Sequence, residues 1–270
     1  MKLLVYIILG IIQGFTEPLP VSSSGHIFLF KNIFNTNMFN DLNFEIVANF
    51  GSFLAILYIF RNDIIELVTS FFKFIFKKTD RKKYKDNFKY CICLIISTIP
   101  VGIVGILLKD FIENKLQNIY FLGCAFLLTA LMLFLIRNKN GKKDDKDISY
   151  KDAIIIGLIQ MVTIMPGISR SGTVLVACLL CGLARKSALK YTFILYFPIS
   201  VATMILGVTD IISANNLSEL LIPYFSGLIA AGIVTYFSYR WLSQIVRNGK
   251  LWKFSIYCIC LAIFIFIYFR

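Results

Sequence analysis

The chain alternates between long apolar stretches and short polar segments. Six stretches of 16 to 20 predominantly apolar residues stand apart from the rest. About 20 such residues are needed for an α-helix to cross the ~30 Å hydrocarbon core of a bilayer. The pattern therefore predicts an all-α, polytopic membrane protein. The six stretches are 45–60, 90–108, 119–136, 191–209, 220–239 and 254–269.

One polar interruption falls inside an apolar region near the start of the chain. Residues 3–16 read LLVYIILGIIQGFT and residues 27–30 read IFLF. Between them, EPLPVSSSGH (17–26) contains a carboxylate, two prolines, three serines and the only histidine of the chain. Irregular polar backbone at membrane depth persists only where protein or a water-filled cavity covers it. We therefore expect a broken helix at a functional site.

The overall composition agrees with a membrane domain. Of 270 residues, 58% are hydrophobic and 16% are charged, and the mean hydropathy is +0.76. Soluble domains carry about 25% charged residues. We therefore treat residues 1–270 as a single integral membrane domain.

The net charge of +13 comes largely from two short segments. Residues 77–89 contain seven Lys and Arg residues, and residues 137–151 contain six. Such clusters are typical of cytoplasmic loops, so we expect no nucleic-acid partner. The segments 109–117 and 210–219 carry fewer cations and are predicted to be external loops. The seven cysteines lie in apolar runs without zinc-site spacing, which indicates packing as small hydrophobic residues.

The polar interruption occurs twice. When the chain is shifted by 147 positions, residues 10–26 align with residues 157–173 without a gap. This match predicts an internal duplication. The identical pairs include Gly10/Gly157, Gln13/Gln160, Thr16/Thr163, Ser22/Ser169, Ser24/Ser171 and Gly25/Gly172.

The charged segments orient the two copies. With both basic loops inside, residues 1–35 become a re-entrant hairpin from outside and residues 152–184 become one from inside. Three crossings follow each hairpin, and this odd number inverts the second copy. The predicted fold is two inverted repeats, each a re-entrant helical hairpin plus three transmembrane helices. Repeat one covers about 1–137 and repeat two about 152–270, joined by the basic loop 137–151, with both termini outside.

The hairpin tips contain the candidate chemistry. Charges at membrane depth indicate a functional site. Serine hydroxyls, backbone N–H groups and a guanidinium suit a phosphate. Gln13 and Glu17 are spaced i, i+4, so their oxygens share one helix face and suit Mg²⁺ or Ca²⁺. A Glu17–Arg170 pair that only fastens the hairpins is the structural alternative. The tip residues are Gln13, Glu17, Ser22, Ser23, Ser24 and His26, and Gln160, Thr163, Ser169, Arg170, Ser171 and Thr173.

The two motifs carry a family resemblance. Gln13-x-x-x-Glu17 with PVSSSGH (20–26), together with PGISRSG (166–172), resembles the bacterial undecaprenyl-diphosphate phosphatases. The resemblance covers the whole chain. It implies a plasma-membrane enzyme with inverted repeats and an active site that opens to the extracytoplasmic side. Such an enzyme removes the terminal phosphate from undecaprenyl diphosphate, recycles the carrier lipid for cell-wall synthesis and confers bacitracin resistance.

The resemblance also implies roles for the tip residues. Arg170 would clamp the diphosphate, and Glu17 with Gln13 would hold a divalent cation, Mg²⁺ or Ca²⁺. The nucleophile stays open between Ser23, His26 and water. The implied catalytic residues are Glu17, Ser23, His26 and Arg170. The implied diphosphate-binding residues are Ser22, Ser24, Gly167, Ser169, Arg170, Ser171 and Thr173.

One position departs from the family motif. The closing threonine of the second motif falls on Val174, which cannot donate a hydrogen bond. Thr173 or Ser171 would then have to replace it.

The same residues also bear on three other classes of membrane protein. A transporter could move a polyprenyl phosphate carrier lipid with the same tips and without hydrolysis. A serine protease is disfavoured because His26 follows Ser23 by three residues and no G-x-S-x-G occurs. A phosphatase of the phosphatidic-acid type needs two histidines. The oligomeric state stays open between a monomer and a homodimer.

Overall fold

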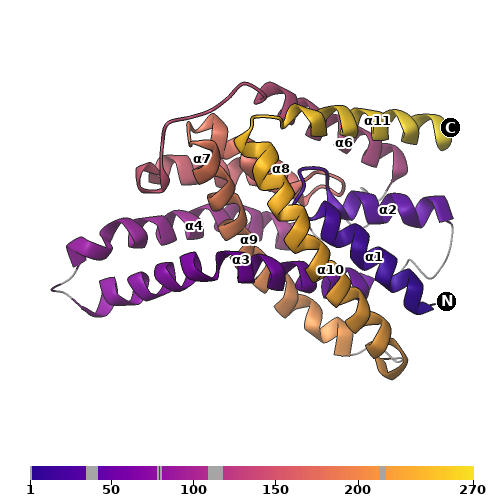
Figure 1. The fold of residues 1–270 in the computed structure, drawn as a ribbon, viewed down its shortest axis with the longest axis horizontal. Helices are drawn as coiled ribbons and strands as arrows, with labels where there is room; N and C mark the ends of the chain where they lie inside the picture. The colour runs from indigo at the N-terminus through magenta and orange to yellow at the C-terminus, as the bar shows by residue number, and fades with distance from the viewer. Residues whose placement is uncertain (1, 35–41, 78, 80, 109–117, 213–216) are drawn as a thin grey trace.

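The computed structural model describes residues 2–34, 42–77, 79, 81–108, 118–212 and 217–270. Within these residues the structure is helical and contains no β-strand, only an isolated bridge between Lys143 and Leu183 (Figure 1). The prediction of an all-α protein is confirmed. The helices are α1 (Lys2–Thr16), α2 (Ser23–Phe34), α3 (Leu42–Phe76), α4 (Arg81–Leu107), α6 (Ile119–Leu135), η3 (Asp145–Asp147), α7 (Tyr150–Gln160), η4 (Met161–Ile164), α8 (Arg170–Leu180), α9 (Arg185–Ile212), α10 (Leu217–Arg247) and α11 (Trp252–Tyr268).

All six apolar stretches fold as helices. Among the described residues, α3, α4, α9 and α10 are long and apolar enough to cross a membrane, so the chain is a multi-pass membrane protein. Helices α6 and α11 are apolar but contain only 17 residues each. At 1.5 Å per residue they are about 26 Å long. The expected external loop 109–117 lies outside the described residues, as do positions 213–216 of the loop expected at 210–219.

The basic segment 77–89 is not the loop that its charge predicts. Helix α3 continues to Phe76 and α4 begins at Arg81, so residues 81–89 of this segment are helical. Lys and Arg are good helix formers, and neither Gly nor Pro interrupts 81–89. Phe74 and Phe88 stack with their ring centroids 4.1 Å apart and join the two helices. The pair extends beyond the neighbouring helices as a long arm (Figure 1).

Both expected helix breaks are present. One lies between α1 and α2, and the other lies between α7 and α8 and contains η4. Each break ends in a serine that caps the next helix. Ser22 Oγ accepts a hydrogen bond from Gly25 N at 3.2 Å, and Ser169 Oγ accepts one from Gly172 N at 3.1 Å. The two copies of the motif therefore fold alike at their helix starts.

Each broken helix packs on a long helix from the other half of the chain. Helix α1 packs on α10, and α7 packs on α4. A Cβ atom added to Gly10 would collide with the Gly227 carbonyl, and one added to Gly157 would collide with the Ser97 carbonyl. Small residues allow helix backbones to approach this closely. Helix α8 is buried over residues 172–179, so the helix that follows the second break lies in the core.

Candidate active site

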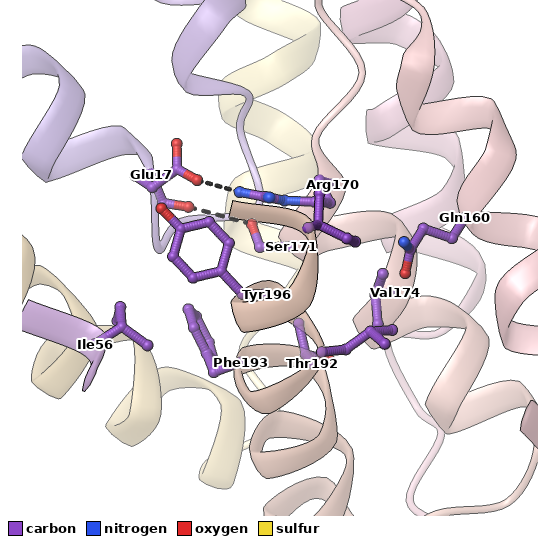
Figure 2. A pocket seen from close by; sticks show the side chains of 11 residues that line it. Glu17, Ile56, Gln160, Arg170, Ser171, Val174, Thr192, Phe193 and Tyr196 are labelled. Carbon is purple, nitrogen blue, oxygen red and sulfur yellow. Dashed lines mark hydrogen bonds and ion pairs between the residues drawn. The ribbon is translucent and has the colours of Figure 1, made fainter. Parts of the chain in front are cut away.

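An ion pair joins the two helix breaks. Glu17 follows the end of α1, and Arg170 is the first residue of α8. The Glu17 side chain is only 7% exposed and that of Arg170 is 24% exposed. The guanidinium carbon lies 4.2 Å from the centroid of the Tyr196 ring on α9 (Figure 2). A buried charge pair needs additional partners to offset its lost hydration, and the aromatic face supplies one of them.

The Glu17 carboxylate also receives two neutral donors. Gln13 Nε2 donates to Oε2 at 2.9 Å, and Ser23 Oγ donates to the same oxygen at 2.5 Å. Arg170 bonds the other oxygen, Oε1. The i, i+4 spacing therefore brings the Gln13 side chain to Glu17, but with its nitrogen rather than its oxygen at the carboxylate, which Ser23 and Arg170 also contact.

The two breaks line one cavity of about 790 Å³. Helices α2 and α8 both begin at this cavity, so two helix N-termini and their hydroxyls are directed at it. Its remaining wall is mostly apolar and is formed by α4 and α9. This chemistry suits a phosphate group attached to an apolar chain. The polar lining includes Glu17, Ser22, Ser23, Ser24, Thr163, Ser169, Arg170 and Ser171, and the apolar lining includes Val101, Gly102, Gly105, Ile106, Ile199 and Ala202.

Direct contacts hold the two breaks against each other. Ser171 Oγ donates to the Leu19 carbonyl at 3.0 Å. The hydroxyls of Ser169 and Ser171 lie 3.2 Å apart. Ser171 therefore faces the cavity and also ties the start of α8 to the first break.

Four of the predicted site residues do not line this cavity: Gln13, His26, Gly167 and Thr173. Thr173 is fully buried, and its hydroxyl has no partner within the described part of the chain. Gly167 lines a neighbouring cavity instead. Val174 lines a small space beside Glu17 and Arg170 (Figure 2). Of the two hydroxyls that could replace the family threonine, only that of Ser171 reaches the main cavity.

His26 is held behind the first break. Its Nδ1 lies 2.7 Å from the Ser22 carbonyl, and its Nε2 lies 2.8 Å from the Tyr257 hydroxyl. Ser22 has a φ of 65°, a left-handed backbone conformation that is rare outside glycine. The His26 contact therefore stabilises the backbone that presents the serines to the cavity.

Sequence reasoning missed three residues around the site. Tyr196 donates its hydroxyl to Asn49 Oδ1 at 2.6 Å while its ring lies against Arg170. Tyr257 bonds His26. Asn49, Tyr196 and Tyr257 lie on helices outside both motifs, so no spacing rule within a motif could have identified them.

Comparison with known proteins identifies the family. The family model described as bacitracin resistance protein BacA matches residues 6–264. The chain belongs to the BacA family. Undecaprenyl-diphosphatase 2 of Bacillus thuringiensis is 42% identical over 266 residues, which cover 98% of this chain and 97% of the relative. Undecaprenyl-diphosphatase 1 of Bacillus licheniformis is 43% identical over 267 residues, which cover 98% of each chain. Neither the BacA family nor these names favours the transporter alternative.

Proposed function

We propose that this BacA-family chain hydrolyses undecaprenyl diphosphate to undecaprenyl phosphate and inorganic phosphate. The observation that carries the proposal is that two helix N-termini and Arg170 face an apolar wall across one shared cavity. The names of the relatives, which match over nearly their full length, support the same substrate. The reaction recycles the carrier lipid for cell-wall synthesis. It also removes the diphosphate that bacitracin sequesters, and so confers resistance.

Arg170 binds the terminal phosphate. Its planar fork can donate to two phosphate oxygens at once, and a phosphate competes with Glu17 for it. In phosphoryl transfer, catalysis consists mainly of positioning and of stabilising the charge that develops on the phosphate oxygens. The serine hydroxyls at the starts of α2 and α8 complete the cradle.

Ser23 is the nucleophile that the geometry favours. Its Oγ attacks the terminal phosphorus, and its proton passes to Glu17 Oε2, 2.5 Å away. The bond from that phosphorus to the bridging oxygen breaks, and undecaprenyl phosphate leaves. Water then hydrolyses the phosphoserine and releases inorganic phosphate. His26 acts as a positioning residue, because both of its ring nitrogens already have partners.

A divalent cation fits the donors at the site. Glu17 lines the cavity and offers carboxylate oxygens, the ligand type preferred by Mg²⁺ and Ca²⁺, whereas Gln13 would offer its amide oxygen only after its Nε2 leaves Glu17. Among the described residues there is no cluster of three or more His, Cys, Asp and Glu side chains. The phosphates of the substrate would therefore complete the coordination shell. When bound, the cation would supply positive charge opposite the diphosphate.

The repeats are proposed to be inverted within a bacterial plasma membrane. The α1–α2 hairpin enters from outside and α7–α8 from inside, while α3, α4 and α6, and then α9, α10 and α11, cross the bilayer. Helix α1 of the first repeat packs on α10 of the second, and α7 of the second packs on α4 of the first. This reciprocal packing supports two repeats related by pseudo-symmetry. The site then opens to the extracytoplasmic side. In a cysteine-free background, an impermeant thiol reagent applied outside should label Lys2→Cys but not Lys142→Cys; the reverse pattern contradicts the orientation.

The activity is tested on purified protein in lipid nanodiscs with radiolabelled undecaprenyl diphosphate. We expect release of inorganic phosphate together with one equivalent of undecaprenyl phosphate. Arg170→Ala is the matched inactive control. Movement of the lipid between leaflets without phosphate release would instead support a transporter.

A further inference from the structure

A second cavity, of about 280 Å³, adjoins the proposed active site. Ser24, Thr163 and Ile164 line both cavities and form the boundary between them. The second cavity also contains the ionic side chains of Lys31 and Glu45. The proposed hydrolysis uses neither of these charges.

The second cavity follows one face of α2. Ser24, Phe28 and Lys31 all line it, at the spacing of one helix face. At 1.5 Å per residue, Lys31 lies about 10 Å beyond Ser24 along the helix axis. In the proposed orientation α2 runs from the active site toward the outer surface. The cavity therefore leads from the serine cradle to Lys31 in the outward direction.

Lys31 is paired but remains close to the cavity. Its Nζ lies 2.5 Å from Glu45 Oε1, and the side chains are 12% and 30% exposed. A charge this poorly hydrated acts strongly on a nearby anion, because the surrounding dielectric is low. Glu45 competes with any such anion for the ammonium group.

The released phosphate needs a polar route out of the active site. Inorganic phosphate is a small, strongly hydrated anion, and passage along the apolar wall of α4 and α9 would cost much of its hydration energy. The second cavity instead offers Ser24, Thr163, Asn118 and Lys31.

We propose that the second cavity is the exit path for inorganic phosphate and that Lys31 draws the anion out of the cradle. Glu45 limits how long the anion stays by competing for Lys31. The proposal rests on the hydrolysis and orientation described above. The alternative is that the Lys31–Glu45 pair only ties α2 to α3.

The experiment compares Lys31→Gln with Glu45→Gln in nanodiscs and measures product inhibition by added inorganic phosphate. The lipid product is quantified by chromatography, so that the added phosphate does not interfere. An exit path predicts opposite effects. Lys31→Gln should raise the inhibition constant for phosphate about 2- to 5-fold, and Glu45→Gln should lower it by a similar factor, the scale of one partly exposed charge contact. Both shifts should shrink at high ionic strength.

Matched controls separate this effect from a loss of packing. Lys31→Arg keeps the charge and should behave like the wild type, as should Lys253→Gln on the exposed face of α11. If both test variants shift the inhibition constant in the same direction, or leave it unchanged, the exit path is wrong. If Lys31→Gln does not fold, Glu45→Gln still tests the proposal. A lower inhibition constant for phosphate in Glu45→Gln supports the exit path, and an equal or higher one contradicts it. Failure of the hydrolysis itself would appear separately, as a wild type that releases no phosphate.

Discussion

Arg170 and Glu17 stand 153 positions apart in the chain and form an ion pair where the two helix breaks meet. The same contact can fasten the two halves together or hold the guanidinium ready for a phosphate. The two roles differ in what happens when both charges are removed together.

Replacing Arg170 should abolish catalysis without unfolding the protein. We expect Arg170→Ala and Arg170→Lys to lose at least ~10²-fold in turnover, the scale of removing one transition-state donor. Lysine keeps the charge but not the planar fork that binds two oxygens. Turnover is measured with undecaprenyl diphosphate, and both variants should still insert and purify.

The double variant Glu17→Gln/Arg170→Gln is the decisive control. A purely fastening pair predicts that removing both charges restores stability and activity, because no unpaired buried charge remains. We expect a stable and inactive protein. An active double variant would contradict the catalytic role of the pair.

Ser23 and His26 should differ in the covalent intermediate that they allow. With labelled substrate and rapid quenching, the wild type should form an acid-stable phosphoenzyme that Ser23→Ala lacks. His26→Ala should lower turnover but still form this intermediate, because it removes the contacts to the Ser22 carbonyl and the Tyr257 hydroxyl and leaves Ser23 in place. His26→Asn can still donate to the Ser22 carbonyl and should retain more activity. An acid-labile phosphoenzyme that persists in Ser23→Ala would make His26 the nucleophile.

Removal of divalent cations should stop the reaction. We expect EDTA to abolish phosphate release and added Mg²⁺ or Ca²⁺ to restore it. Glu17→Ala should remove most of the turnover, whereas Gln13→Ala should mainly raise the cation concentration required, since a neutral amide is the weaker ligand. Full activity of Glu17→Ala in EDTA would rule out the metal role.

Asp152 should make folding stability dependent on pH. Burial raises the pKa of this carboxyl, but hydrogen bonds from Ser149 and Lys143 outweigh that effect and leave the pKa below its usual value. The carboxylate therefore stabilises the fold above the unfolded pKa of ~3.9, and this stabilisation is lost as the pH falls through the lower pKa of the folded state.

Replacement by Asn measures that contribution. Asp152→Asn should lower the free energy of unfolding by about 1–2 kcal/mol at pH 7, a value reduced because Lys143 is partly exposed. Thermal unfolding of both proteins at several pH values checks this, and turnover should be unchanged. A stability difference that stays constant into strongly acidic pH would show that charge is not the cause.

Local sequence determined the helices and the two breaks. Apolar runs, prolines and capping serines set the backbone conformation of residues only a few positions away. The breaks at 17–22 and 161–169 therefore follow from the local sequence. The repeated Ser-x-Ser-Gly likewise produces the same cap at α2 and α8. The loop predicted from charge at 81–89 is wrong, because the helix propensity of these residues extends α4 through them.

Only the tertiary structure decided which side chains share the site. Ser23 and His26 are three positions apart, yet Ser23 bonds Glu17 whereas His26 bonds Tyr257 on α11. The Tyr196 ring on α9 lies against Arg170, and its hydroxyl donates to Asn49 on α3. The contacts His26–Tyr257 and Tyr196–Asn49 join residues 231 and 147 positions apart, so they depend on how distant helices cross one another. Helical periodicity and residue spacing describe a single segment, so they carry no information about such crossings.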